Sequence, residues 1–182
     1  MFEIHTQRLR LIPLNLQNLL LLKEDRAAME KNLNLAISQQ VIDPPIQAEI
    51  ADAIDFWIVK VSQNEENYPW FTNWEMVLKE KNVSIGGIGL TGAPDKQGQV
   101  MVGYGLDKNY HNQGFATESL QALIQWVFKN PDAKSIIAET KADNVASQKV
   151  LSKNGFKQVD RKEDLMLWKL EREAWETKKP AN

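Results

Sequence analysis

The chain of 182 residues has no cysteine, and its only histidines are His5 and His111. Without cysteine there are no disulfide bonds, no thiolate nucleophile and no cysteine metal site. Two histidines also argue against a histidine-rich metal centre. We therefore expect no metal, and any chemistry must rely on other side chains or on the main chain.

Neither sign of charge dominates the sequence. The 22 Lys and Arg residues nearly balance 24 Asp and Glu, which leaves a formal charge of −2 and no long basic run, so no nucleic-acid partner is expected. No stretch approaches the roughly 20 apolar residues of a membrane span, and the N-terminus lacks the apolar core of a signal peptide. We expect a cytoplasmic protein, as a monomer or homodimer, without a membrane partner.

Hydrophobic periodicity predicts alternating strands and helices. Apolar stripes at helical spacing predict helices over 16–33, 46–61 and from about 116 to 129, and a further helix is expected from a cap at Asp143 or Asn144 to Asn154. Strands are predicted over 6–12, 74–78, 84–91, 100–106, 135–140 and 164–170. The three consecutive strands between 74 and 106 have short links, which favours an antiparallel meander.

The seven residues 110–116, YHNQGFA, link a glycine-interrupted strand to an amphipathic helix. At a helix N-terminus the first backbone N–H groups have no intrahelical partner, and the helix dipole favours negative charge. Gly114 has no Cβ to block a ligand's approach, although a glycine here can also serve only to shape the turn. The loop is therefore a candidate phosphate site.

Several motifs occur in a fixed order: GGIGL at 86–90, GYGL at 103–106, HNQGFATE at 111–118, NVAS at 144–147 and NGF at 154–156. Together they resemble the GNAT superfamily of acetyl-CoA-dependent N-acetyltransferases, in the RimJ/RimL-like branch that acetylates ribosomal-protein N-termini. The resemblance covers about residues 6–170 and implies one GNAT domain over 1–182 with a charged tail at 171–182. It implies an α/β (α+β) fold with a mixed, mostly antiparallel sheet, splayed between strands 100–106 and 135–140.

By this resemblance, acetyl-CoA lies in the cleft between the two splayed strands. Pantetheine amides would pair with the backbone around Leu106. The diphosphate would contact the backbone of the loop, and Asn144 would hold the pantetheine or orient the next helix. The loop residues carried over are His111, Asn112, Gln113, Gly114, Phe115, Ala116 and Thr117. The acetyl group would pass directly to a primary amine, in line with the absence of cysteine.

The chain departs from the family pattern at its phosphate loop and at its general acid. His111 stands where relatives commonly have Arg or Gln, and it could contact the ligand, carry a proton or be a surface residue. Leu151 occupies the position of a common tyrosine acid. Ser147 matches a serine that the RimL-like branch is thought to use near the departing thiolate, but a serine is also tolerated in a first helical turn.

The general base is also missing, because Met101 stands where close relatives often have a glutamate. Glu139, Glu75 and Tyr104 are candidates to relay a proton through water, and each could instead belong to a solvated strand face or the edge of the core. A site without a strong base favours an α-amine with a pKa near 8, since a lysine pKa near 10.4 places its neutral form about 4 kcal/mol away at cellular pH.

The acceptor stays open between a protein N-terminus and a small amine. Within the aromatic set around residues 57–74, most members read as core, and Tyr68 and Trp70 are the best candidates to face a substrate. A non-catalytic acyl-CoA-binding module is the alternative, with Met101 and Leu151 as traces of lost chemistry. A nucleotide-binding α/β domain is disfavoured, because its glycine-rich fingerprint and downstream acid are absent.

Overall fold

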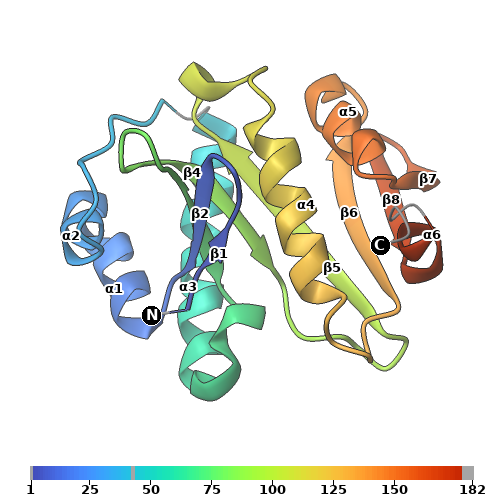
Figure 1. Ribbon diagram of the computed structural model, residues 1–182, viewed down its shortest axis with the longest axis horizontal. Coiled ribbons are helices and arrows are strands. Elements are labelled where there is room, and N and C mark those ends of the chain that lie inside the picture. Colours follow the sequence, from blue (N-terminus) through green and yellow to red (C-terminus); the bar gives the residue numbers. More distant parts are fainter. Residues whose placement is uncertain (1, 42–43, 178–182) are drawn as a thin grey trace.

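The computed structural model describes residues 2–41 and 44–177 and contains one eight-stranded sheet (Figure 1). The strand order is β1-β2-β3-β4-β5-β6-β8-β7, and β5–β6 is a parallel pair whereas the others are antiparallel. The strands are β1 (Ile4–His5), β2 (Leu9–Pro13), β3 (Asn73–Leu78), β4 (Val83–Leu90), β5 (Gln99–Leu106), β6 (Ser135–Lys141), β7 (Lys157–Lys162) and β8 (Leu165–Glu171). This is the mixed, mostly antiparallel sheet expected from the sequence.

Helices cover both faces of the sheet. They are α1 (Leu16–Glu24), α2 (Arg26–Asn32), α3 (Pro44–Gln63), α4 (Phe115–Val127), α5 (Val145–Lys153) and α6 (Arg172–Glu176), with short 3-10 helices η1 (Glu65–Trp70) and η2 (Lys108–Tyr110). One buried cluster joins α4 and α5 to the sheet, and a second joins α1, α2 and α3 to its other face. Figure 1 shows α4 in front of the sheet and α3 behind it. Within the described residues, no helix is long and apolar enough to cross a membrane.

Strands β5 and β6 separate after three residue pairs. Gln99, Val100 and Met101 pair with Ser135, Ile136 and Ile137, whereas β5 beyond Met101 pairs only with β4. The two strands diverge toward the start of α4 in Figure 1. The predicted splay is therefore present, and it exposes one edge of β5 from Val102 to Leu106.

Glycines within a strand such as β5 indicate either a bulge or a close approach of the backbone, and the bulge is absent. The register of β5 with β4 is regular from Val102 to Leu106, and the register shift in this part of the sheet lies between Glu75 and Val77 on β3. The close backbone approach in this part of the sheet is at Gly86 of β4, where a Cβ would lie 2.3 Å from the carbonyl oxygen of Gly105. A Cβ built on Gly103 of β5 would meet nothing within 4 Å, so no close approach explains that glycine.

The predicted helix 16–33 is divided at Asp25. This residue has an extended backbone, with φ of −156° and ψ of 115°, and its side chain accepts a hydrogen bond from Ala27 N at 2.9 Å. Asp25 therefore ends α1 and caps α2, which turns the second helix toward the sheet. The sequence pattern also missed β1 and β7, because they are short or exposed and carry little apolar periodicity.

Strand β3 is buried on both faces, although alternation had predicted a half-buried strand with Glu75 on its solvent side. Trp74 and Met76 join the cluster beneath α4. Glu75 has 0% exposure and faces the helices on the opposite side. The explanation of Glu75 as part of a solvated strand face is therefore wrong.

Candidate active site: two cavities that meet at strand β5

Two cavities lie beside the splayed part of the sheet, and Tyr104 and Gly105 line both of them. The first, which we call the coenzyme cavity, has a volume of about 310 Å³ and lies between the loop before α4 and helix α5. The second, called the acceptor cavity, has a volume of about 550 Å³ and lies between α3 and strands β3, β4 and β5. Tyr104 and Gly105, at the end of β5, therefore lie between the coenzyme cavity and the acceptor cavity, which open on different sides of the strand.

The loop before α4 is held by its own polar groups. Asp107 is buried and accepts a hydrogen bond from Asn109 N at 3.0 Å, which starts η2. Gln113 Nε2 donates to Asn109 O at 3.0 Å, and Asn112 and Gly114 have φ of 59° and 83°. Left-handed conformations are tolerated by glycine and, less readily, by asparagine. These two left-handed backbone conformations allow the loop to curl around a ligand.

The backbone N–H groups of residues 112–117 have no acceptor among the described residues, and the first intrahelical bond here is that of Glu118 N to Gly114 O at 3.0 Å. Gly114 is the N-cap of α4 and provides no side-chain cap. Unpaired amides at the start of a 13-residue helix, whose dipole favours anions, form a ready site for phosphate groups. The predicted loop residues Asn112, Gly114, Phe115, Ala116 and Thr117 line the coenzyme cavity, as do His111 and Leu106.

An ion pair holds the loop from its outer side. Arg8 Nε donates to Glu118 Oε2 at 2.7 Å, Arg8 Nη1 donates to the carbonyl oxygen of Gln113 at 2.9 Å, and Thr6 Oγ1 donates to Glu118 Oε1 at 2.6 Å. Burial alone would raise the pKa of Glu118, but the hydrogen bonds from Thr6 and Arg8 and the charge of Arg8 lower it overall. Strand β2 and the segment before it therefore fix the position of the first turn of α4.

Two of the three predicted catalytic residues meet across the splay. Tyr104 Oη lies 2.8 Å from Ser147 Oγ and donates to Ser147 O at 3.2 Å. Asn144, the N-cap of α5, accepts a hydrogen bond from Ser147 N at 3.0 Å and so fixes the first turn of that helix. Burial raises the pKa of Tyr104 to about 12, although the hydrogen bond with Ser147 opposes this shift. The tyrosine is therefore a protonated hydrogen-bond donor at neutral pH.

The remaining predicted residues lie as follows. Glu139 on β6 is exposed and lines neither of the two cavities described here, so its role as a base stays a prediction. His111 Nε2 is 3.0 Å from Leu106 O, which places the ring against the end of β5. Gln113 contacts the loop itself through Asn109 rather than lining the coenzyme cavity.

Lys149 and Lys153 line the coenzyme cavity and were missed by the sequence analysis. They are four residues apart on α5 and therefore lie on one face of that helix. Their spacing, directly after the NVAS motif, is the signal that could have identified them. They add positive charge opposite the free amides of residues 112–117, which makes the cavity more favourable for a polyanion.

The part of the acceptor-cavity floor that β4 and β5 form contains four glycines. Gly87 and Gly89 of β4 pair with Gly105 and Gly103 of β5, so the four glycines face the same side of the sheet and all line this cavity. A Cβ built on Gly103 would meet nothing within 4 Å. The roof is formed by one face of α3, with Ile50, Ala53, Phe56 and Trp57, and Leu22 of α1 contributes at the side.

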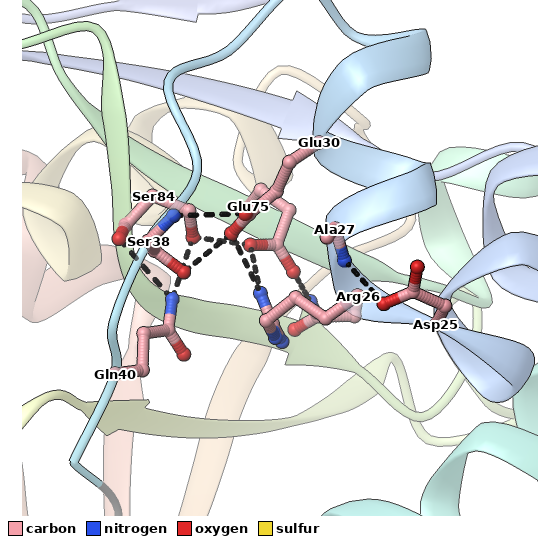
Figure 2. A network of polar contacts seen from close by, with 9 residues as sticks. Asp25, Arg26, Ala27, Glu30, Ser38, Gln40, Glu75 and Ser84 are labelled. Carbon is pink, nitrogen blue, oxygen red and sulfur yellow. Dashed lines mark hydrogen bonds and ion pairs between the residues drawn. The ribbon is translucent and has the colours of Figure 1, made fainter.

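A buried polar network forms one wall of the acceptor cavity (Figure 2). Glu75 Oε2 accepts from Arg26 Nη1 at 3.0 Å and from Ser84 Oγ, and Glu75 Oε1 accepts from Asn73 Nδ2 at 2.9 Å. Burial alone would lower the pKa of Arg26, but Glu75 and Glu30 together raise it. The carboxylate of Glu75 is therefore held by three donors and fixes both Asn73 and Arg26.

The network continues away from the sheet to the segment after α2. Glu30 is fully buried, accepts from Ser38 Oγ at 2.5 Å and from Ser38 N at 2.9 Å, and lies 3.8 Å from Arg26 Nη1. Gln40 Nε2 donates to Ser84 Oγ at 2.9 Å, whereas the buried Oε1 of Gln40 has no partner among the described residues. Figure 2 shows this oxygen pointing away from the network.

Different aromatic residues from those predicted line the acceptor cavity. Tyr68 packs in the cluster beneath α1, α2 and α3, and Trp70 packs against Trp126 with ring centroids 4.4 Å apart. Neither lines the acceptor cavity, whereas Phe56 and Trp57 of α3 do. The structure also has no group of three or more His, Asp or Glu side chains placed to hold a metal ion within residues 2–41 and 44–177.

A splayed sheet with free main-chain amides beside the opening defines an acyl-CoA-type transferase fold. Residues 8–157 match the family model described as an acetyltransferase (GNAT) domain. The match covers most of the chain, which therefore belongs to the GNAT acetyltransferase family. The expected family and fold are both confirmed.

Known relatives extend this assignment. Over 86 residues the chain is 35% identical to the uncharacterized N-acetyltransferase YjdG of Bacillus subtilis (strain 168), a match that covers 47% of this chain and 51% of that protein. The chain thus spans about half the length of the curated relatives it matches.

Solved structures match over nearly the whole chain. The ribosomal-protein-S5-alanine acetyltransferase from Vibrio fischeri superposes with a TM-score of 0.66 at 19% identity, covering 99% of this chain and 100% of the other. RimL, a ribosomal L7/L12 alpha-N-protein acetyltransferase in complex with coenzyme A, gives a TM-score of 0.64 at 19% identity and covers 95% and 99%. At these identities the likeness concerns the fold alone.

Proposed function

We propose that this protein is an N-acetyltransferase that moves the acetyl group of acetyl-CoA directly to a primary amine. The observation that carries the proposal is the row of free main-chain amides at residues 112–117 beside the opening between β5 and β6. Membership of the GNAT family supports the same reaction. The coenzyme-bound structure of RimL supports coenzyme A as the carrier for this fold.

The coenzyme cavity fits acetyl-CoA in its charge and in its hydrogen-bonding groups. The backbone N–H groups of residues 112–117 would donate hydrogen bonds to the diphosphate, and Lys149 and Lys153 supply positive charge on the opposite side. The unpaired edge of β5 from Val102 to Leu106 offers backbone groups to the two amides of the pantetheine arm. The thioester would then lie near Tyr104 and Ser147.

Transfer requires the amine nitrogen to attack the thioester carbonyl carbon, so that a C–N bond forms as the C–S bond breaks. The nitrogen loses one proton and the sulfur gains one. Tyr104 and Ser147 can donate hydrogen bonds toward the departing sulfur, because both hydroxyl groups are protonated at neutral pH and hold each other in place. Holding both substrates in adjoining cavities removes much of the entropic cost of their encounter.

The acceptor would enter through the acceptor cavity, because this space reaches Tyr104 and Gly105 from the other face of the sheet. Neither Tyr104 nor Ser147 is a base at neutral pH, and Glu75 is closed off by its own three partners. An amine that is already partly neutral at cellular pH is therefore favoured over a lysine side chain. A protein N-terminus and a small weakly basic amine both meet this condition.

Calorimetric titration with acetyl-CoA, followed by thiol release in the presence of amines and peptides, tests the proposal. Micromolar binding and acceptor-dependent release of coenzyme A are expected. Binding without release for any acceptor would identify a non-catalytic acyl-CoA-binding module instead. Absence of binding would reject both interpretations.

A further inference from the structure

The glycine floor makes the acceptor cavity large enough for an entire small molecule. Its volume of about 550 Å³ lies within the range of roughly 300–1,000 Å³ typical of small-molecule sites. The open space above Gly103 is the clearest part of this volume. Side chains of Phe56, Trp57 and Ile50 face the floor from α3, so the body of any occupant must be apolar.

One hydrogen-bond acceptor is fixed on the floor of the cavity. Asn73 Nδ2 donates to Glu75 Oε1, and because a carboxylate paired with Arg26 can only accept, the amide nitrogen must face Glu75. Asn73 Oδ1 consequently lies over Gly87, 2.4 Å from the position that a Cβ would occupy there, and has no donor among the described residues. An N–H group of a ligand could donate a hydrogen bond to this free oxygen.

The charges around the cavity favour a cation. Arg26, Asp52 and Glu75 are the charged residues that line it, one positive and two negative, and the buried Glu30 lies 3.8 Å behind Arg26. Because Arg26 is already flanked by two carboxylates, a ligand carboxylate here would meet net negative charge, whereas an ammonium would reduce it. Amino acids with a free carboxylate are therefore disfavoured.

The pairing of strands β3, β4 and β5 shows where Asn73 Oδ1 lies relative to Tyr104 and Gly105. Glu75 pairs with Gly87, and Gly87 pairs with Gly105, so Glu75 and Gly105 are two strand spacings apart, about 10 Å. Asn73 Oδ1, above Gly87, lies between them. An amine bound at Asn73 is thus on the path to Tyr104 and Gly105, where the two cavities meet.

We propose that the acetyl acceptor is a small primary amine with an apolar body and no carboxylate. An N–H group of its amine donates a hydrogen bond to Asn73 Oδ1. This inference rests on the proposed function for its chemistry, but the binding it describes does not require acetyl-CoA. Glu75 acts as a positioning residue, because it orients the Asn73 amide while its own oxygens accept from Arg26, Asn73 and Ser84. A protein N-terminus is the competing occupant that the experiment must distinguish.

The test measures binding of L-phenylalaninamide, in its protonated form and without acetyl-CoA, to the full chain by calorimetry. L-phenylalanine tests the carboxylate, N-acetyl-phenylalaninamide tests the ammonium, and a ten-residue peptide beginning with Phe tests a protein N-terminus. We expect the amide to bind at least 10-fold more tightly than each of the other three. Equal binding of the N-acetylated compound, or tighter binding of the peptide, would overturn the inference.

Two variants fill the cavity from opposite walls. Gly103→Leu adds a side chain to the floor where a Cβ meets no neighbour, and Ala53→Leu adds one to the roof. Each should weaken phenylalaninamide binding at least 10-fold, and Ala53→Leu, which lies on α3 away from the coenzyme cavity, should leave acetyl-CoA affinity within 2-fold. Ala51→Leu is the matched control, because Ala51 is exposed on the same helix and should leave both affinities unchanged. Unaltered amine binding in both cavity variants would place the ligand elsewhere.

Asn73→Ala tests the hydrogen bond itself and should weaken phenylalaninamide about 10-fold with little effect on N-acetyl-phenylalaninamide. A loss common to both compounds would indicate only a structural role. These measurements also separate the two proposals. Failure of acetyl-CoA to bind would reject the proposed function while amine binding still decides the inference, and turnover of peptides alone would retain the function and reject the small acceptor.

Discussion

The coenzyme cavity and the acceptor cavity are lined by the same end of β5 but are built from different chemical groups. The coenzyme cavity depends on main-chain amides at residues 112–117, positioned by the conformations of Asn112 and Gly114. The acceptor cavity depends on a side-chain network centred on Glu75 and on the absence of side chains from its glycine floor. Backbone geometry therefore controls the first, and buried polar contacts control the second.

This difference predicts which changes damage folding and which damage only binding. A side chain can be replaced in a loop of free amides with little loss, provided that the backbone keeps its shape. In a buried network, removal of one charge leaves its partners without compensation. Replacement of a single side chain should therefore have little effect in the loop of the coenzyme cavity, whereas in the buried network of the acceptor cavity it should destabilise the fold.

The largest effect is expected from Glu75→Ala. The change leaves Arg26, Asn73 and Ser84 without their shared acceptor and should lower the free energy of unfolding by about 3–5 kcal/mol, measured by urea denaturation. Glu80→Ala, on the exposed turn of the same hairpin, is the control and should change it by less than about 0.5 kcal/mol. A loss below about 1 kcal/mol at Glu75 would contradict the central role of the network.

Gly114→Val should affect the coenzyme cavity more than the fold. A β-branched residue is strained at φ of 83°, and the added side chain would approach Arg8 and the space in front of the free amides. We expect acetyl-CoA affinity to fall about 100-fold by calorimetry, with phenylalaninamide affinity retained. Gly92→Val, in another loop without a left-handed backbone, serves as the control. Unchanged affinity at Gly114 would refute the assigned phosphate loop.

Tyr104→Phe tests the group at which the two cavities meet. Loss of the hydroxyl removes the bond to Ser147, so turnover should fall about 10-fold while both binding affinities stay within 2-fold. Ser147→Ala should give a similar loss, and the double variant should lose little more because the two hydroxyl groups act together. Full activity in both single variants would remove this pair from the reaction.

The raised pKa of Tyr104 gives the same variant a pH signature. The folded pKa, about 12, lies above the ordinary value of 10, so the stabilisation from the protonated phenol is complete below pH 10 and is lost as the pH rises toward 12. The stability advantage of wild type over Tyr104→Phe should therefore decline in that interval. Unfolding at pH 9 and pH 11 measures it, and an advantage that grows with pH would have the wrong sign.

The smallest effect is expected from Glu118→Gln at the outer side of the phosphate loop. Because the pKa of Glu118 is lowered in the folded chain, its stabilisation is present above its ordinary pKa and is lost as the pH falls through the folded value. We expect the variant to lose about 1 kcal/mol at pH 7 and to match wild type under strongly acidic conditions. A difference that persists unchanged at low pH would exclude the ionised pair with Arg8 as its source.

The predictions that succeeded from sequence rest on local geometry. Gly114 has a positive φ at the start of α4, and Asn144 caps α5, because these conformations are set by a few adjacent residues. The break at Asp25 was missed because the apolar run at 19–22 continues a helical pattern through it. Lys149 and Lys153 were missed because their spacing shows that they share one face of α5, but the position of that face opposite residues 112–117 depends on the tertiary structure.

For Glu75 the sequence predicted the strand correctly but not the burial of the side chain. Its alternation with Trp74 and Met76 gave the strand correctly, yet the pattern placed it on a solvated face. Arg26 and Ser84, which hold it in the interior, lie 49 and 9 residues away in the chain. No local periodicity reports that a charged residue has a distant partner.

The sequence alone determined the order of the longer strands and helices and the cap at Asn144, since each depends on backbone preferences and side-chain alternation within one segment. The tertiary structure decided that four glycines from two strands form one bare floor, that two hydroxyl groups meet across the splay, and that a buried carboxylate orients Asn73. These features arise only when strands far apart in the chain pair in register, because pairing sets which side chains share a face and which charges share a dry environment.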